Sequence, residues 1–474
     1  MTVWTRAAMG LAACALLFAR STDLSLRIAP ASVASLTDRT VAPAAVVTAS
    51  AAADSAAADS AAVARTFYRD ALAHHQRGAL DSAVVFARHA QDRWPSQSAY
   101  AVLVALLSAR QSDARTLVNA LDQLTRMEAG GEVTADSAIR RMTRSPSVLA
   151  EQTARAVARL ERATAPMPRS RIFATLHDST LFPEGLDIDG GTGTLYVASV
   201  RHGVVVERRA NGRERRIPLD AAQREGAALA VRLDARRTHL WITTSGIGQS
   251  LGWTPADSGL AALLRVRAAD GVVERRYPLP VVPGGHTLGD VAVSATGDVY
   301  VSDSNHPVLY RLRAGGDSLE AFRSPLFRSL QGIAPSADGS AVYVADYSHG
   351  ILRFDPATGA VRRVSDASGT TALGIDGLVL HGRHLIAIQN GISPMRVVRL
   401  ALDSTGMRIT EALTLDRQAA PAGEPTIGAV AGDAFVYVSN SGWAHYDARG
   451  RRVAGTRLAP PVIRRLPLTP PARH

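Results

Sequence analysis

Lysine is absent from the sequence, and cysteine occurs once. All 53 basic side chains are therefore arginines, and the formal net charge is +11. The arginines are scattered along the chain and are not interleaved with aromatic residues, so the positive charge does not indicate a nucleic-acid partner. The lone cysteine, Cys14, excludes an internal disulfide framework and any metal site built from several cysteines.

Two families of catalytic motif are also missing. The chain has no glycine-rich phosphate-binding loop and no zinc-protease helix motif. We also identify no Gly-x-Ser-x-Gly nucleophile elbow. We therefore expect neither a serine hydrolase nor a nucleotide-dependent enzyme. The length of 474 residues is too great for one ordinary core, so we expect two or more domains.

The N-terminal residues 1–20 contain the apolar run Ala7–Ala19 after Arg6. This run is too short to span a membrane and fits the hydrophobic part of a signal peptide. We expect a signal peptide or an N-terminal anchor here, export to the periplasm or the medium, and membrane contact only through such an anchor. Leu11-Ala12-Ala13-Cys14 resembles a lipobox, so a lipoprotein anchored through Cys14 is the alternative, although the apolar run continues past it.

A helical domain is predicted for residues 64–165. It follows an Ala-rich linker over residues 21–63, where apolar residues recur with neither the period of a helix nor that of a strand. Small residues recur at positions where two helices approach each other, with a glycine at the turn and a proline at the end. These residues are Ala71, Gly78, Ala83, Ala87, Ala90 and Pro95. The pattern resembles a tetratricopeptide repeat, followed by a less regular helical pair and a further helix near residues 148–163. The domain packs on the rest of the protein or offers an assembly surface to a protein partner.

From residue 170 to 458 apolar residues alternate as they do in β-strands, and one sequence pattern recurs. An acidic or polar residue opens an apolar strand, a turn follows, and a second apolar strand ends in small polar residues. The second strands lie roughly 43 to 59 residues apart, which is typical of four-stranded blades. They are Leu195-Tyr196-Val197, Leu240-Trp241-Ile242, Val299-Tyr300-Val301, Val342-Tyr343-Val344, Leu385-Ile386-Ala387 and Val436-Tyr437-Val438. We therefore predict an all-β six-bladed β-propeller behind the helical domain, with a Pro/Arg-rich tail over residues 459–474.

Closure of the ring needs one more strand. Fourth-strand patterns flank the repeats at 171–176 and at 452–458. We expect one of them to complete the last blade, because a closed ring leaves no open sheet edges.

Polar residues that open the inner strands should converge at one end of the propeller channel. Glu184, Asp290, Gln331 and Asp376 are such openers. Their carboxylate and amide oxygens are suitable ligands for a hard divalent cation. The alternative is that polar openers only solvate a water-filled channel.

The order of these openers resembles the senescence-marker-protein/gluconolactonase family, which includes regucalcin, over residues 170–456. The resemblance rests on Glu184-Gly185-Leu186, Gly289-Asp290-Val291, Gln331-Gly332-Ile333 and Asp376-Gly377-Leu378. It implies a six-bladed propeller with one Ca²⁺ or another divalent ion, such as Zn²⁺ or Mn²⁺, and hydrolysis of lactones. Glu184 and Asp376 match the family's metal ligands. Its third-blade Asn falls on Gly289 beside Asp290, and its fourth-blade Asn falls on Gln331.

The resemblance implies that the metal polarises the lactone carbonyl and that Asp376 acts as general base on water. A second group of candidates comes from the sequence itself. His202, His306 and His349 each follow a second-strand tyrosine by six residues. Imidazoles gathered at the mouth can bind a transition metal or act as a base, whereas the alternative is a polar loop position that recurs with the blades.

Asp303 and Asp346, three residues after their tyrosines, are interpreted as loop-capping residues. Two functional hypotheses therefore follow from the sequence. One is a metal-dependent hydrolase of lactones or small esters. The other is a non-catalytic propeller that binds a small ligand or a protein, with the helical domain as an assembly surface.

Overall fold

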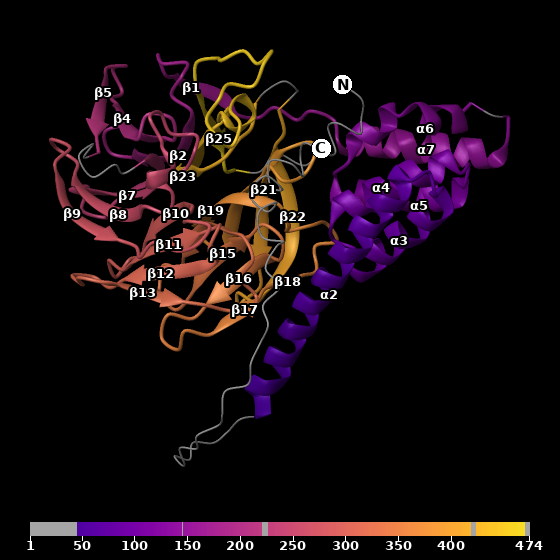
Figure 1. Cartoon of the computed structure of the whole chain (residues 1–474), viewed down its shortest axis with the longest axis horizontal. Coiled ribbons are helices and arrows are strands. Elements are labelled where there is room, and N and C mark those ends of the chain that lie inside the picture. The colour runs from indigo at the N-terminus through magenta and orange to yellow at the C-terminus, as the bar shows by residue number, and fades with distance from the viewer. Residues whose placement is uncertain (1–44, 145, 220–225, 419–422, 470–474) are drawn as a thin grey trace.

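The computed structural model describes residues 45–469 except 145, 220–225 and 419–422 (Figure 1). The predicted signal peptide with Cys14 and most of the predicted linker lie outside the described residues. Helix α2 begins at Ala45, so residues 45–63 are helical and not a linker as predicted. The physical reason is composition: these residues are rich in alanine, which has the strongest intrinsic helix propensity even where no apolar face is present.

The helical region consists of consecutive antiparallel helices that pack in sequence order. Its long helices are α2 (Ala45–Gln76), α3 (Leu80–Arg93), α4 (Ser98–Arg110), α5 (Ala114–Met127) and α7 (Val148–Ala163), with the short α6 (Ser137–Met142) between the last two. Helix α4 is buried almost all round because the other helices surround it. Side chains of Asp113 and Ser147 cap α5 and α7 by accepting backbone N–H groups. The helical pairs were predicted, while their assignment to tetratricopeptide repeats stays a prediction.

None of the helices within the described ranges is both long and apolar enough to cross a bilayer.

Six sheets form the propeller, as predicted, and each runs from an inner to an outer strand. Blades one to three comprise β2 (Pro183–Asp189), β3 (Thr194–Ser199), β4 (Val204–Arg208) and β5 (Glu214–Pro218); β6 (Ala227–Leu233), β7 (His239–Ser245), β8 (Ala261–Arg267) and β9 (Val273–Pro278); and β10 (Leu288–Val293), β11 (Val299–Asp303), β12 (Val308–Leu312) and β13 (Leu319–Phe322). Blades four and five comprise β14 (Leu330–Pro335), β15 (Val342–Asp346), β16 (Gly350–Phe354) and β17 (Val361–Arg363); and β19 (Ile375–His381), β20 (His384–Gln389), β21 (Arg396–Leu402) and β22 (Arg408–Asp416), with the two-residue β18 (Ser365–Asp366) beside β22.

Blade six closes the ring with strands from both ends of the propeller sequence. Its order is β23 (Gly428–Ala431), β24 (Ala434–Val438), β25 (Val462–Pro467) and β1 (Arg171–Thr175). The N-terminal candidate therefore completes the last blade. The strand predicted at 452–458 was wrong, because those residues lie in the loop between β24 and β25.

Strand β25 lies inside the segment 459–474 that was predicted as a tail, so the propeller extends to Pro467 and not to 458. Burial explains this difference. Ile463 and Leu466 of β25 are fully buried against β24, whereas residues 452–455 are exposed. Pairing with β24 decides which segment becomes the third strand.

The helical region lies against blades four and five. Figure 1 shows it beside β17, β18 and β22. Leu373, in the loop before β19, is buried among alanine and aromatic side chains of α2, α3 and α4. The loops before inner strands and those after second strands lie at one end of each blade, since Pro183 pairs with Ser199 and Ile375 with Gln389. We call this end the mouth.

Candidate functional site

Three acidic side chains meet at the mouth. Glu184 lies at the start of β2, Asp376 at the start of β19, and Glu424 in the loop before β23. Glu184 is buried, and the other two are half-buried. They come from blades one, five and six, so closure of the ring brings them together.

The electrostatics of these three carboxyl groups are unfavourable as they stand. Burial, and then the charge of Asp376, raise the pKa of Glu184 well above its ordinary value. Burial and the charge of Asp376 also raise the pKa of Glu424 to about 7. Burial raises the pKa of Asp376 to about 7, against the effect of its hydrogen bond from Asn390. Within the described part of the chain, no arginine or histidine forms an ion pair with any of the three.

Neighbouring donors orient the carboxylates. Trp443 Nε1 donates to Glu184 Oε2 at 2.7 Å, and Asn390 Nδ2 donates to Asp376 Oδ2 at 2.6 Å. The Tyr347 hydroxyl in turn donates to Asn390 Oδ1 at 3.1 Å. The hydrogen bonds from Trp443 and Asn390 each hold one carboxylate oxygen.

The predicted ligands Asp290 and Gln331 make other contacts. Asp290 is 1% exposed, and its two oxygens accept the backbone N–H groups of Val291 and Ile333, each at 2.9 Å. Gln331 lies 3.4 Å from the hydroxyl groups of Ser304 and Ser329. Every side-chain oxygen of these two residues therefore accepts a hydrogen bond.

Gly289 occupies the position of the family's third-blade asparagine. A Cβ atom added there would lie 2.9 Å from Ser304 Oγ and 3.2 Å from Gln331 Oε1. The site therefore has no room for a larger residue at this position unless these side chains move.

Arg232 in β6 lies beside Asp290, whose charge contributes to the raised pKa of Glu184 and of Asp376. Its guanidinium donates to the carbonyl groups of Leu186, Val291 and Gly428, which belong to blades one, three and six. Arg232 Nη2 lies 3.7 Å from Asp290 Oδ1. The guanidinium thus lies across the channel and supplies positive charge to Asp290.

The oxygen-only donor set of Glu184, Asp376 and Glu424 fits a hard divalent cation such as Ca²⁺ or Mn²⁺ better than Zn²⁺. Across the described residues, no three His, Cys, Asp or Glu side chains are already arranged as metal ligands. The chemistry of the three carboxylates therefore fits a cation, and binding it requires their side chains to turn toward one point.

The three histidines at the recurring loop position each contact a different neighbour. His202 Nε2 lies 3.0 Å from Thr180 Oγ1, His306 packs edge-on to His286, and His349 Nδ1 lies 2.8 Å from the Leu326 carbonyl. Burial lowers the pKa of each. They do not form a metal-ligand group in the described parts of the chain.

The loop position itself has a structural explanation. Asp303 Oδ1 accepts the backbone N–H groups of Asn305 and His306, and Asp346 Oδ1 accepts those of Ser348 and His349. The prediction that these two aspartates cap the loops is therefore confirmed.

A Gly-x-Ser-x-Gly pattern at 248–252 was missed in the sequence. It lies in the loop between β7 and β8, and no α-helix follows it there, only the three-residue 3-10 helix Pro255–Asp257. The Ser250 hydroxyl donates to the Val200 carbonyl at 3.3 Å. The pattern therefore lacks the strand-turn-helix context of a hydrolase nucleophile.

Sequence reasoning also missed Glu424, Asn390 and Trp443. Asn390 directly follows β20, so the rule that polar residues end second strands could have found it. Glu424 lies four residues before β23, and Trp443 lies in the long loop after β24, where no period places them.

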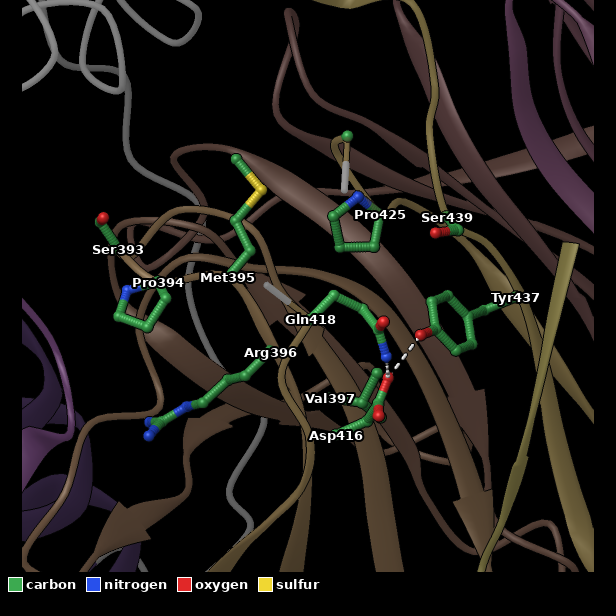
Figure 2. Close-up of a pocket in the computed structure, with 11 residues that line it drawn as sticks. Ser393, Pro394, Met395, Arg396, Val397, Asp416, Gln418, Pro425, Tyr437 and Ser439 are labelled. Atoms are coloured by element: carbon green, nitrogen blue, oxygen red, sulfur yellow. Dashed lines mark hydrogen bonds between the residues drawn. The ribbon is translucent and has the colours of Figure 1, made fainter. Parts of the chain in front are cut away.

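A cavity of about 260 Å³ lies beside Glu424, between blades five and six (Figure 2). Its lining is Ser393, Pro394, Met395, Arg396, Val397, Asp416, Gln418, Gly423, Pro425, Tyr437 and Ser439. Figure 2 shows Gln418 and Tyr437 pointing toward Asp416, to which they donate hydrogen bonds of 2.8 and 2.7 Å. Burial opposes ionisation of Asp416, but these and other hydrogen bonds lower its pKa. Its charge is thus satisfied within the wall of the cavity.

Comparison with known proteins finds distant structural likenesses. No family model and no curated protein matches the sequence. Among solved structures, a luciferin-regenerating enzyme aligns at 14% identity over 64% of this chain and 95% of its own, with a TM-score of 0.45. Regucalcin from Agrobacterium tumefaciens, described as a calcium-binding protein, aligns at 17% identity over 62% of this chain and 93% of its own, with a TM-score of 0.43. Virginiamycin B lyase from Staphylococcus aureus aligns at 14% identity over 57% of this chain and 82% of its own, with a TM-score of 0.41. At such low identities and TM-scores these likenesses concern the propeller fold and say nothing about the ligand or the activity of this chain.

Proposed function

We propose that the mouth of the propeller binds a divalent cation through Glu184, Asp376 and Glu424, and that this site hydrolyses lactones or small esters. The observation that carries the proposal is the meeting of three acidic side chains with no ion-pair partner among the described residues. Charges removed from water are costly unless a counter-charge accompanies them. A cation with oxygen ligands supplies that counter-charge.

The chemistry proposed for the site follows from the orientation of its carboxylates. A divalent ion held by Glu184, Asp376 and Glu424 would supply Lewis-acid polarisation of an ester carbonyl. Asp376 Oδ1 accepts a proton from water while Oδ2 stays bonded to Asn390, which Tyr347 holds in place. Water oxygen joins the acyl carbon, the acyl C–O bond breaks, and the proton passes to the leaving oxygen. The lactone class comes from the resemblance of the strand openers and not from the shape of the site.

A non-catalytic binding propeller is the second candidate. Gly289 and Gln331 stand where the resembling family has asparagine ligands, and this departure favours binding without hydrolysis. In this case the mouth binds a small ligand, and the helical region offers an assembly surface to a protein partner.

The test is calorimetric titration of the full-length protein with Ca²⁺ and with Mn²⁺. We expect a single site in the wild type, and Glu424→Gln and Asp376→Asn should weaken binding by at least about tenfold. Asp317→Asn is the matched control, because Asp317 is exposed and pairs only with Arg275 on the surface. Absence of cation binding in the wild type would refute the proposal. Binding without hydrolysis of any lactone or ester in a substrate screen would favour the second candidate.

A further inference from the structure

Two loops hold Asp376 in place. One covers residues 370–374 and leads directly into β19, and the other covers residues 390–395 and begins with Asn390. Backbone hydrogen bonds join them, since the Gly391 N–H donates to the Gly374 carbonyl. The position of Asp376 therefore depends on what fixes these two loops.

The helical region fixes both loops through apolar contacts. Leu373, three residues before Asp376, is buried in a cluster with Ala61, Ala64, Ala90, Trp94 and Tyr100 of the helices. Ile392, two residues after Asn390, is buried with Met127 and Ala129 at the end of α5. One side chain of each loop is thus part of a hydrophobic cluster of the helical region.

A series of polar contacts also joins the helical region to these loops. Glu128, the residue after α5, pairs with Arg396 Nη1 at 3.3 Å. The Arg396 side chain is 1% exposed, and its Nε donates to Gln389 Oε1 at 2.7 Å. Gln389 Nε2 then donates to the carbonyl groups of Thr371 and Leu373 at 2.8 and 2.9 Å. Continuous hydrogen bonding therefore joins α5 to the backbone that precedes Asp376.

A second arginine, Arg417, also joins Glu128 of the helical region to blade five. Arg417 pairs with Glu128, and its Nη1 donates to the carbonyl groups of Ala163 and Ala165 at the end of α7. One glutamate thus neutralises two buried arginines of blade five. Removing the charge of Glu128 leaves both guanidinium groups without their acidic partner.

We propose that the helical region positions Asp376 and Asn390 at the mouth and thereby sets the affinity of the mouth for a divalent cation. The contacts that do so are the apolar ones of Leu373 and Ile392 and the chain of polar contacts from Glu128 through Arg396 to Gln389. This inference rests on the proposed function, and it makes the helices part of the site although none of the three proposed ligands belongs to a helix. Loops without strand pairing are the least stable parts of a fold unless other elements hold them. Glu128, Arg396, Gln389 and Leu373 are positioning residues.

The experiment compares four variants of the full-length protein. Leu373→Ala removes the apolar anchor, and Glu128→Gln removes the charge of the polar chain while keeping its shape. Leu103→Ala is the control for loss of helical packing, since Leu103 is buried within the helical core. Glu161→Gln is the control for loss of a helical charge, since Glu161 pairs with the exposed Arg140.

Two readouts are measured on each variant: the dissociation constant for Mn²⁺, and hydrogen exchange of the loop amides without any cation. We expect Leu373→Ala and Glu128→Gln to raise the dissociation constant by about tenfold and to speed exchange of the Gly374 and Gly391 amides, with no such change in either control. Unchanged affinity and unchanged exchange in both test variants would overturn the inference. If the wild type binds no Mn²⁺, the proposed function fails, and hydrogen exchange alone then decides whether the helices position the loops.

Discussion

Replacing Arg232 with methionine tests whether one guanidinium holds the inner strands of the propeller together. Arg232 donates to carbonyl groups of three other blades and lies near Asp187 and Asp290. Methionine keeps most of the buried apolar stem but leaves three carbonyl groups, the buried Asp290 and the half-buried Asp187 without the positive charge. The expected result is a less stable propeller with an unchanged fold.

The magnitude follows from the cost of breaking a buried ion pair by removal of one partner. That cost is about 4 kcal/mol, which lowers the melting temperature by about 10 °C in a domain of this size. Arg275→Met is the matched control, because Arg275 lies on the outer strand β9 and pairs with the exposed Asp317. The control should change the free energy of unfolding by about 0.5 kcal/mol or less.

The loss should depend on pH in a defined direction. Burial raises the pKa of Asp187 and of Asp290 even in the presence of Arg232. Without the guanidinium both pKa values rise further. A carboxyl group whose folded-state pKa exceeds its unfolded value destabilises the fold above the unfolded pKa and not below it. The destabilisation by Arg232→Met should therefore be greatest at neutral pH and shrink as pH falls toward about 4.

Urea unfolding at several pH values measures these effects. Adding Asp290→Asn to Arg232→Met should recover part of the lost free energy, because the amide carries no charge to bury. A loss as small as that of Arg275→Met, or a loss that does not vary with pH, would refute the role assigned to Arg232.

Three further outcomes follow from the structure. His286→Gln should destabilise the protein most below pH 6.5. Burial opposes the charged form of His286, but hydrogen bonding to Asp303 raises its pKa, so the stability gained from the charged form is lost as pH rises through that raised pKa. Unfolding at pH 5.5 and at pH 9 measures this difference. Tyr437→Phe removes the hydroxyl that donates to Asp416 at 2.7 Å and should cost about 2 kcal/mol in urea unfolding at pH 7, whereas a loss near zero would mean that the remaining donors satisfy Asp416. Chelation of protein loaded at a hundredfold excess of cation over the dissociation constant should remove about 2.7 kcal/mol of stability and lower the melting temperature, whereas a Glu424→Gln variant with tenfold weaker binding should lose only about 1.4 kcal/mol at the same cation concentration.

The fold could be predicted from the sequence because its signal is repeated and local. Alternation of apolar residues marks the second strands, and their spacing indicates four-stranded blades. The end of the ring could not be predicted in the same way. Residues 452–458 and 462–467 both have strand-like patterns, and pairing of Ile463 with Val438 of β24 selected the second of them.

Some residues of the candidate site could likewise be predicted from the sequence, and others could not. Glu184 and Asp376 could be placed at the mouth because strand openers converge there in any propeller. Glu424, Asn390 and Trp443 could not be grouped with them, because loop length and the course of the backbone decide where such side chains lie.

Only the tertiary structure places Arg232 beside Asp290. Arg232 reaches Asp290 across the channel from another blade, and no sequence spacing encodes that reach. The helical region is the second case. Its helices follow from apolar period and capping residues, but its contacts with Leu373 and Ile392 depend on docking between segments far apart in the chain. Local pattern determined the strands and the helices of this protein, and side-chain contacts over long sequence distances decided its site.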